Sequence, residues 1–232
     1  MHKSLLSASL IAFALATPFA QAHEAGDFIV RAGAITVNPK ASSSSVKVDQ
    51  GPLAGADLGG KATMNSNTQL GLNFAYMLTN NVGIELLAAS PFQHDVNLKG
   101  TSLGAANGKL GTLKHLPPTL SVVYYPLDNK SVFQPYVGAG INYTWIYDEK
   151  LSNEAQANGF SNFKAKNSWG MAFQVGADYM ITDNIMLNAQ MRYIDINTRA
   201  TVENDAVAPG TRARVNVDVD PFVYMVGLGY KF

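Results

Sequence analysis

The sequence contains no cysteine and few charged residues. Its 232 residues include 17 Lys and Arg against 17 Asp and Glu, and charged residues make up 15% of the chain. Without cysteine the chain has no disulfide framework, no thiolate nucleophile and no cysteine-ligated zinc. Because the charges balance, the composition gives no reason to expect nucleic acid as a partner. We therefore predict no nucleic-acid partner and no cofactor.

A long hydrophobic run is also missing. The first residues are apolar from Leu5 to Ala16, but the run is short and Pro18 interrupts it. Ala20-Gln21-Ala22 fits the cleavage site of a secretory signal peptide, whereas a membrane anchor needs about 20 apolar residues. We predict a signal peptide over residues 1–22 and a mature chain over residues 23–232. A mean hydropathy of +0.01 excludes a polytopic helical membrane protein. It is compatible with a barrel, in which lipid-facing and lumen-facing residues alternate.

The last residues, from Asp220 to Phe232, alternate with a period of two. Every second residue from Phe222 to Phe232 is apolar or aromatic, while the other parity holds Gly227, Gly229 and Lys231. This period predicts a β-strand, and its length suits a strand that crosses a bilayer at a tilt, which needs roughly 9–11 residues. The alternation with a terminal aromatic resembles the targeting signal of outer-membrane barrels. The residues assigned to that signal are Val226, Leu228, Tyr230 and Phe232.

The same alternation recurs along the chain. Eight strands are expected, and short turns alternate with long connections over residues 38–66, 92–113, 148–166 and 203–214, whose composition is typical of loops. An even number of strands lets the sheet close, which lipid requires because it offers unpaired backbone groups no partner. The sequence therefore predicts an all-β, eight-stranded, antiparallel, up-and-down transmembrane β-barrel with long extracellular loops and short periplasmic turns. The expected strands begin near residues 26, 67, 82, 114, 136, 169, 187 and 220.

Aromatic residues favour this interpretation over a soluble barrel. A lipocalin-like periplasmic protein would also have eight up-and-down strands, and parity alone does not separate the two folds. Strand length, the alternation of connections and the terminal Phe favour the membrane barrel, as do aromatic residues near both ends of the strands. The predicted aromatic girdles consist of Trp145, Trp169, Tyr76, Tyr179, Tyr230 and Phe232.

Several segments make the resemblance to one family specific. They are GDFIVRAGAITVNP, LPPTLSVVYYP, QPYVGAGINYT, WGMAFQVGADYMITDNIMLNAQMRYIDI and VDPFVYMVGLGYKF. The chain resembles the outer-membrane protein W (OmpW) family and is most similar to its OprG type from Pseudomonas. The resemblance implies passive uptake of small hydrophobic molecules across the outer membrane of a Gram-negative cell. The implied partners are the lipid bilayer, lipopolysaccharide, the barrel-assembly machinery and small hydrophobic solutes.

Two consecutive prolines begin the fourth predicted strand. Pro117 and Pro118 lack an N–H, so together they remove one ladder bond on each side of the strand. One interpretation is a weakened wall that opens sideways and releases cargo into the bilayer. The other is a strand that frays into its loop above the bilayer, where water replaces the lost bonds. Pro91, at the end of the third strand, is a further candidate for the opening.

Polar residues share the inward parity with apolar ones. An eight-stranded barrel leaves an interior that side chains nearly fill, and a charge buried there needs a partner. We expect a polar plug near the periplasmic end, with an apolar funnel above it. The predicted plug residues are Arg31, Glu85, Asp178, Gln190 and Arg192.

Catalysis is not expected. One predicted loop is flanked by His94, Asp95, Ser102 and His115. These residues are candidates for a catalytic triad or a surface metal site. Catalysis requires a base held within about 3 Å of its nucleophile, and Gly-rich, flexible surroundings do not provide that. Two functions remain beside uptake with lateral release: a narrow channel for small apolar amino acids, and a structural or bacteriocin-receptor barrel with a blocked lumen.

Overall fold

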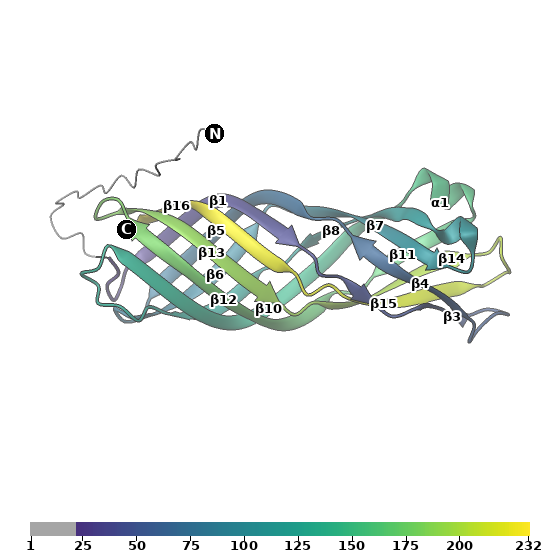
Figure 1. The fold of residues 1–232 in the computed structure, drawn as a ribbon, viewed down its shortest axis with the longest axis horizontal. Coiled ribbons are helices and arrows are strands. Elements are labelled where there is room, and N and C mark those ends of the chain that lie inside the picture. The colour runs from purple at the N-terminus through teal and green to yellow at the C-terminus, as the bar shows by residue number, and fades with distance from the viewer. Residues whose placement is uncertain (1–21) are drawn as a thin grey trace, which may run out of the picture.

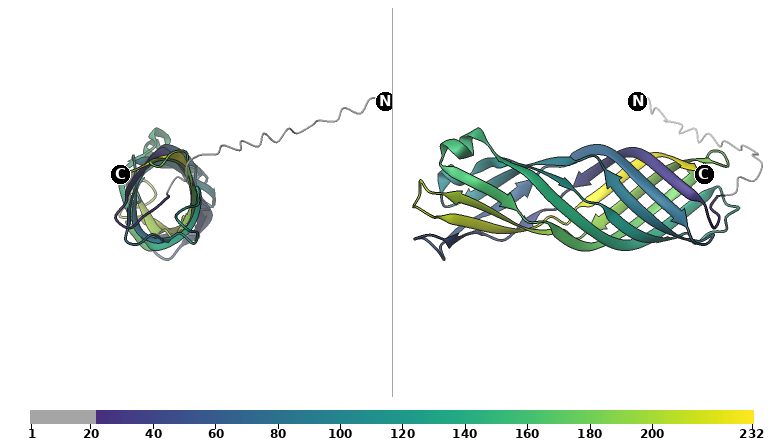
Figure 2. Two further views of the ribbon diagram at one scale, coloured as in Figure 1. Left: turned by 90° about the vertical axis from the view of Figure 1, so that its left-hand side faces the viewer. Right: turned by 180° about the vertical axis from the view of Figure 1, so that it is seen from behind.

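The computed structural model describes residues 22–232, and almost all of its regular structure is antiparallel β-strand. The strands form one elongated tube (Figure 1), and a view along its length shows them around a single lumen (Figure 2). The predicted signal peptide lies outside the described residues, except for Ala22. No helix within residues 22–232 is both long and apolar enough to cross a membrane.

Eight strands form a closed barrel, which confirms the predicted fold class. They pair in the order β1–β5–β6–β9–β10–β12–β13–β16, and β16 pairs back with β1. Closure leaves no strand edge unpaired at the level of the barrel. The barrel strands are β1 (Phe28–Asn38), β5 (Asn67–Met77), β6 (Val82–Ala89), β9 (Thr119–Tyr124), β10 (Phe133–Leu151), β12 (Ser168–Met180), β13 (Ile185–Ile194) and β16 (Phe222–Lys231).

Short turns join these strands at one end of the barrel, which we call the turn end. The Leu78 N–H donates to Val82 O at 2.8 Å between β5 and β6, and the Ile181 N–H donates to Ile185 O at 2.8 Å between β12 and β13. The C-terminus and the start of β1 lie at this end (Figure 1). The short connections therefore fall where the sequence predicted them.

At the opposite end the long connections fold into a second set of strands, which we call the extension. Its sheet runs β10–β8–β7–β4–β3–β15–β14–β11, so β10 belongs to both parts. A short helix, α1 (Asn153–Ala157), and a 3-10 turn, η1 (Gly104–Ala106), connect some of these strands. The added strands are β2 (Ser42–Ser43), β3 (Val46–Gln50), β4 (Asp57–Met64), β7 (Phe92–Thr101), β8 (Gly108–Leu116), β11 (Phe160–Ala165), β14 (Asn197–Asn204) and β15 (Arg212–Asp218).

The four long connections are present as predicted, but the expectation of loop structure is wrong for the parts that form these strands. Ser, Gly and Pro made these segments resemble loops, but their apolar residues still alternate. In β3, for example, Val46 and Val48 are buried while Lys47 is exposed. Hairpins that continue the barrel strands can bury their apolar faces against one another, because each hairpin pairs with neighbouring hairpins.

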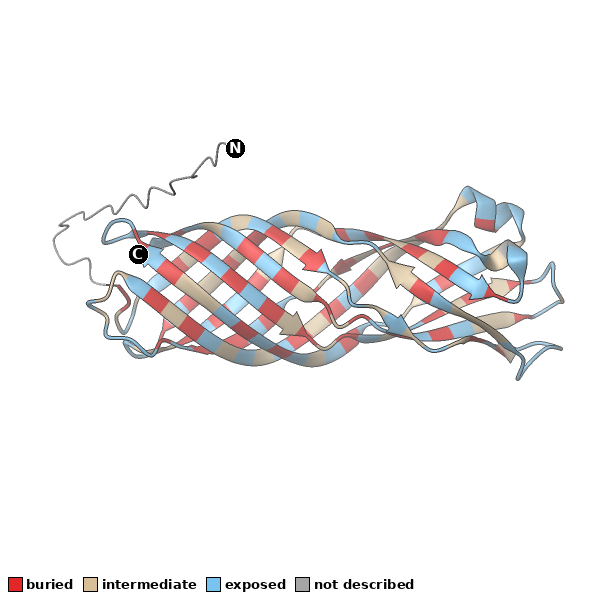
Figure 3. Ribbon diagram, in the orientation of Figure 1, coloured by how far each residue is buried: buried red, intermediate tan, exposed pale blue. Residues whose placement is uncertain are grey.

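Alternating burial follows every barrel strand (Figure 3). On β16, Val223 and Met225 are buried, whereas Tyr224, Val226 and Leu228 are exposed. The apolar parity therefore faces outward around the barrel, as a lipid-facing surface requires. Outward apolar residues on other strands include Leu70, Leu86, Leu120, Val122, Val137, Ile141, Phe173, Val175 and Leu187.

Candidate functional site

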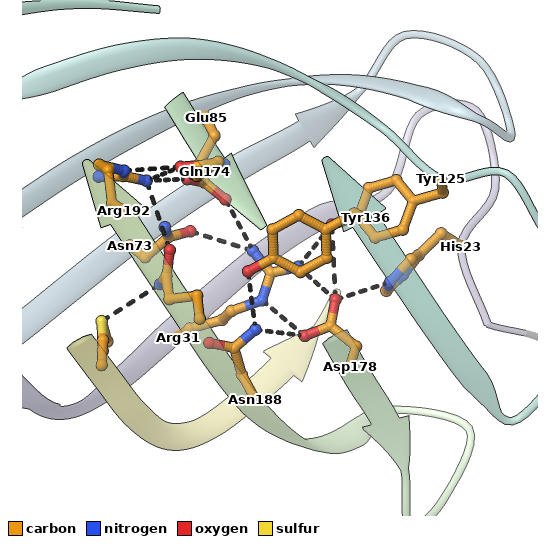
Figure 4. A network of polar contacts seen from close by, with 12 residues as sticks. His23, Arg31, Asn73, Glu85, Tyr125, Tyr136, Gln174, Asp178, Asn188 and Arg192 are labelled. Carbon is orange, nitrogen blue, oxygen red and sulfur yellow. Dashed lines mark hydrogen bonds and ion pairs between the residues drawn. The ribbon is translucent and has the colours of Figure 1, made fainter. Parts of the chain in front are cut away.

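Inward-facing polar side chains meet near the turn end, in what we call the charged network (Figure 4). All of its members are buried, and they come from six barrel strands and from the segments beside the turns. Inward parity directs them into the lumen, and the narrow interior brings them into contact. The members are His23, Arg31, Asn73, Glu85, Tyr125, Tyr136, Gln174, Asp178, Asn188, Gln190 and Arg192.

Arg31 and Asp178 form the first ion pair of the network. The Arg31 Nε donates to Asp178 Oδ1 at 3.0 Å, and its Nη2 donates to Oδ2 at 2.5 Å, so the contact is bidentate. His23 Nε2 lies 3.0 Å from Asp178 Oδ2, and Asn188 Nδ2 donates to Oδ1 at 2.8 Å. The Tyr125 hydroxyl accepts from Arg31 Nη2 at 2.8 Å. Both charges are therefore satisfied, as burial demands.

Arg192 and Glu85 form the second ion pair. Arg192 Nη2 donates to Glu85 Oε1 at 2.6 Å, and Arg192 Nε donates to Gln174 Oε1 at 2.7 Å. Gln174 Nε2 donates to the same Glu85 oxygen at 2.9 Å. Arg31 Nη1 lies 3.5 Å from Glu85 Oε2 and joins the two pairs. The two arginines and two carboxylates balance, so the network encloses no excess of either charge.

The five residues predicted as a plug lie together, although Gln190 is peripheral. Its Oε1 lies 3.4 Å from Arg192 Nη2, and its Nε2 lies 3.4 Å from Met225 Sδ. Sequence reasoning missed the neutral members of the network. The inward parity of Asn73, Tyr136, Gln174 and Asn188 was a usable signal. Tyr125 directly follows β9 on its inward parity and offered the same signal, whereas His23 lies outside the regular strands and gave none.

A glycine makes room for one aromatic member. A Cβ atom added at Gly176 would lie 2.5 Å from Cζ of Tyr136, so the Tyr136 ring covers this glycine. The Tyr136 hydroxyl accepts from Asn188 Nδ2 at 3.0 Å, and the Arg31 guanidinium lies 5.6 Å from the centre of its ring. The ring thereby fills the lumen between opposite walls.

The charged network separates two buried apolar clusters. Ile29, Met77 and Met186 belong to a cluster at the turn end, while Ile35 and Ile194 belong to a larger one that continues into the extension. Along the inward parity of β1, Ile29 precedes Arg31 and Ile35 follows it. Buried side chains thus occupy the lumen on both sides of the network.

An apolar cavity lies above the network, where the barrel meets the extension. We call it the inner chamber. It encloses about 390 Å³, part of it open to solvent. Its only ionisable lining residues are His94 and His115, and its apolar lining consists of Val37, Met64, Leu113, Ile146, Ile196, Val219 and Pro221, with Thr144 and Thr198.

Two more apolar cavities follow along the extension, and we call them together the outer chamber. The spaces between their lining atoms are about 250 and 590 Å³, part of each open to solvent, and the two cavities share Val46, Leu98, Val202 and Ala213. Along β14 the lining passes from Thr198 at the inner chamber to Ala200 and then to Asn204. The interior above the network is therefore apolar from the far end down to the barrel.

The wall of the tube is interrupted beside the inner chamber. The ladder between β5 and β6 ends at the pair Gly71–Ala89, and the ladder between β4 and β7 resumes at Met64–Val96. No backbone ladder joins the intervening residues 65–69 and 91–95, a stretch that we call the wall interruption. His94 Nδ1 donates to Asn65 O at 2.6 Å, and the Asp95 N–H donates to Asn65 Oδ1 at 2.7 Å. Side chains thus replace part of the missing ladder.

The predicted proline sites differ in their effect on the wall. Pro91 is exposed and lies at the wall interruption. Pro117 and Pro118 separate β8 from β9, but the wall toward β10 stays connected there, because the Tyr143 N–H donates to Pro118 O at 3.1 Å. Asn142 Nδ2 also donates to both proline carbonyls, at 3.0 and 3.1 Å. On the other side of Pro91 the ladder breaks between Leu87–Thr119 and Phe92–His115, so Pro91 faces the two prolines across a shorter gap, and the longer gap is the wall interruption.

Comparison with known proteins identifies the family. The family model described as the OmpW family matches residues 24–232. The chain belongs to the OmpW family. Outer membrane protein W of Vibrio cholerae is 46% identical over 211 residues, which cover 91% of each chain. The Escherichia coli K12 protein of the same name is 41% identical, over 99% of this chain and 100% of the other.

A solved structure agrees with this assignment. The crystal structure of the outer membrane protein OprG from Pseudomonas aeruginosa is 47% identical and superposes with a TM-score of 0.84, over 91% of this chain and 98% of that one. The predicted resemblance is confirmed. The OmpW-family chain is therefore an outer-membrane β-barrel of a Gram-negative cell.

The predicted girdle residues all have exposed side chains on the outer surface. Trp145 and Trp169 lie toward the extension, and the Trp169 ring centre is 4.6 Å from that of Tyr143. At the turn end, Phe232 is 70% exposed and its ring lies 4.7 Å from that of Tyr230. Tyr76 and Tyr179 are exposed on the same end of the barrel. These positions fit the two interfaces of a bilayer.

The histidines of the extension are not where the sequence placed them. The expectation of flexible surroundings is wrong, because His94 and His115 are buried in paired strands and their Nε2 atoms lie 2.9 Å apart. Asp95 turns outward to Lys109, with Oδ1 and Nζ 2.8 Å apart. Among the described residues no group of three or more His, Cys, Asp or Glu side chains is placed to hold a metal ion.

Proposed function

We propose that this barrel admits small hydrophobic molecules from the extracellular side and releases them sideways into the bilayer at the wall interruption. The proposal rests on one observation: the lumen is apolar on the side of the extension and charged on the side of the turn end. Apolar chambers lead inward through the extension, and the charged network with its flanking clusters fills the lumen below them. In this proposal, a solute that has entered the inner chamber has no open path through the charged network toward the turn end.

The wall interruption supplies the exit in this proposal. Met64 and His94 line the inner chamber and also flank the interruption, so the chamber borders the weakened wall. Opening this wall breaks few backbone bonds, because side chains already replace the ladder there. Pro91 maintains the gap, since proline has no N–H with which to extend the ladder. Pro117 and Pro118 weaken the next strand and complete the opening.

Membrane partners follow from the outer surface. We propose that the outward apolar residues contact the acyl chains and that the two aromatic groups lie at the interfaces, with lipopolysaccharide around the extension. The alternating strand that ends in Phe232 serves as the signal for the barrel-assembly machinery. Each of these contacts uses residues that are exposed in the folded chain.

Solute transfer into vesicles tests the proposal. The vesicles have a lipopolysaccharide outer leaflet as the barrier, and transfer of toluene and of alanine is measured with the wild-type protein, Pro91→Ala, and Pro117→Ala with Pro118→Ala. We expect Pro91→Ala to lower toluene transfer by about two- to tenfold, the effect of gaining one net hydrogen bond that closes the wall. Pro126→Ala, in a short turn, is the matched control and should transfer toluene at the wild-type rate.

Other outcomes separate the competing functions. Toluene transfer that is the same in all variants would refute lateral release. Alanine transfer that does not depend on the prolines would favour a vertical channel for small amino acids. If correctly inserted protein transfers neither solute, the barrel is structural or a receptor, and its function resides in the extension.

A further inference from the structure

The two buried histidines of the inner chamber form a hydrogen-bonded pair with one possible arrangement of protons. Asn65 O can only accept, so His94 carries its proton on Nδ1, which lies 2.6 Å away. The neutral His94 then has an unprotonated Nε2. His115 Nε2 lies 2.9 Å from that atom and must donate to it. The proton of His115 is therefore on Nε2, and its Nδ1 is an acceptor.

Burial keeps this pair neutral. Desolvation lowers the pKa of His115 to about 3 and also lowers the pKa of His94. The ring of His115 stacks on Phe92, with ring centres 5.4 Å apart and planes at 22°. Phe92 and the contact with His94 fix the orientation of the imidazole, so its free acceptor has a defined position.

His115 Nδ1 has no hydrogen-bond partner among residues 22–232, although the atom is buried. The other polar side chains of the chamber are occupied as donors. The Thr144 hydroxyl donates to Asn142 Oδ1 at 2.7 Å, and the Thr198 hydroxyl donates to Lys166 O at 2.6 Å. A buried acceptor without a donor costs free energy. Any donor for this nitrogen must come from a molecule that enters the chamber.

We propose that the inner chamber is a binding site for small apolar molecules that carry one hydrogen-bond donor, such as a phenolic or alcoholic hydroxyl, which donates to His115 Nδ1. The apolar lining receives the body of the solute, and the unpaired acceptor on His115 orients it. This inference rests on the proposed uptake function and names the solute class that the chamber prefers. The site adjoins the wall interruption, because His94 bridges from β7 to Asn65 across it.

The test compares three solutes of similar size: phenol, anisole and toluene. Phenol has a hydroxyl donor, anisole has an oxygen that only accepts, and toluene has neither. Each is titrated into the full-length barrel in lipid nanodiscs, with the imidazole nitrogens labelled with ¹⁵N. The His115 resonances are assigned by their loss in His115→Phe, which keeps an aromatic ring on Phe92 but has no acceptor.

We expect phenol alone to shift the resonance of His115 Nδ1. Phenol should bind about two- to tenfold more tightly than anisole, the range set by one net hydrogen bond. In His115→Phe this preference should disappear while toluene binding remains. The titration of the wild-type protein needs no variant, so the test holds even if His115→Phe does not fold.

Two results would overturn the inference in different ways. Equal binding of phenol and anisole, with the His115 Nδ1 resonance unmoved, would refute the preference for a donor and leave uptake of apolar solutes intact. Binding of none of the three solutes would refute both this inference and the proposed function.

Discussion

Asp178 shows what keeps charge inside the lumen. Its carboxylate receives both Arg31 contacts and is also bonded to Asn188 and close to His23. Removing one partner of a buried ion pair leaves the other charge uncompensated, which costs about 3–5 kcal/mol. We therefore expect Asp178→Asn to lower the free energy of unfolding by about that amount, measured by urea titration of the refolded barrel.

The exposed turn residue Asp183 provides the control. Asp183→Asn makes the same chemical change where the side chain is exposed, and it should alter the free energy of unfolding by less than about 0.5 kcal/mol. Equal effects of the two substitutions would contradict the account of the charged network.

The histidine pair makes the stability of the extension depend on pH. His115 keeps a pKa of about 3 in the folded chain, whereas an unfolded histidine has one near 6.5. As the pH falls below 6.5, the unfolded state takes up a proton that the folded pair does not. The contribution of the pair to the free energy of unfolding is therefore fully present above pH 6.5. Below pH 6.5 it falls by about 1.4 kcal/mol per pH unit for each such proton, until the pH reaches the pKa of the histidine in the folded chain. Thermal unfolding between pH 7 and 4.5 measures this loss.

Asp95 and Lys114 are the charged sequence neighbours of His94 and His115, and both have salt-bridge partners. Asp95 contacts Lys109 at 2.8 Å, and Lys114 contacts Asp148 at 2.7 Å. The double variant His94→Gln, His115→Gln separates the effect of the histidines from that of the carboxylates, because it removes both histidines and keeps both salt bridges. It should lose less stability than the wild-type protein over the same pH range, and an identical loss would assign the effect to the carboxylates.

At the scale of elements, strand parity could be predicted from the sequence and strand pairing in the extension could not. The alternation in β16 determined which residues face lipid, because one face of every barrel strand must be apolar. In β4 the run Gly59-Gly60-Lys61 has a loop-like composition, yet the strand pairs with β7. Its pairing depends on neighbours that are distant in the sequence, so local composition does not reveal it.

The wall interruption predicts uneven protection of backbone amides along β5. Leu72 pairs with Ala88 in the ladder, whereas no ladder to β7 reaches Thr68. The amide of Thr68 should therefore exchange with deuterium about tenfold faster or more than that of Leu72, because local opening there breaks fewer bonds. Exchange measured by NMR in nanodiscs tests this. Equal protection would mean that the wall is as firmly closed at this point as elsewhere.

At the scale of the whole molecule, part of the candidate site followed from the sequence. Charged residues on the inward parity, such as Arg31 and Glu85, must be paired in a narrow lumen, so a plug could be predicted. The inner chamber could not, because it lies between the barrel and an extension that the sequence presented as loops. The sequence singled out Pro117 and Pro118 because they are consecutive. The longer gap in the backbone ladder nevertheless lies at Pro91, in the wall interruption.

The last residue is expected to matter for assembly more than for stability. Phe232 is 70% exposed, and its backbone N–H donates to Phe28 O at 2.9 Å. Deleting Phe232 should reduce the amount of barrel in the outer membrane several-fold, while the refolded protein unfolds within about 0.5 kcal/mol of the wild type. Phe133→Ala, at another exposed aromatic of the turn end, is the control. A matching loss from Phe133→Ala would argue against a terminal signal.

The most direct test of the account locates an apolar solute inside the barrel. Nuclear Overhauser contacts between toluene and side-chain methyl groups can be recorded with the protein in deuterated nanodiscs. We predict contacts with Ile146 and Ile196 in the inner chamber and with Met64 beside the wall interruption. Ile29 and Met186, on the other side of the charged network, should show none. Contacts with Ile29 or Met186 would mean that solutes pass straight through the lumen, and would contradict lateral release.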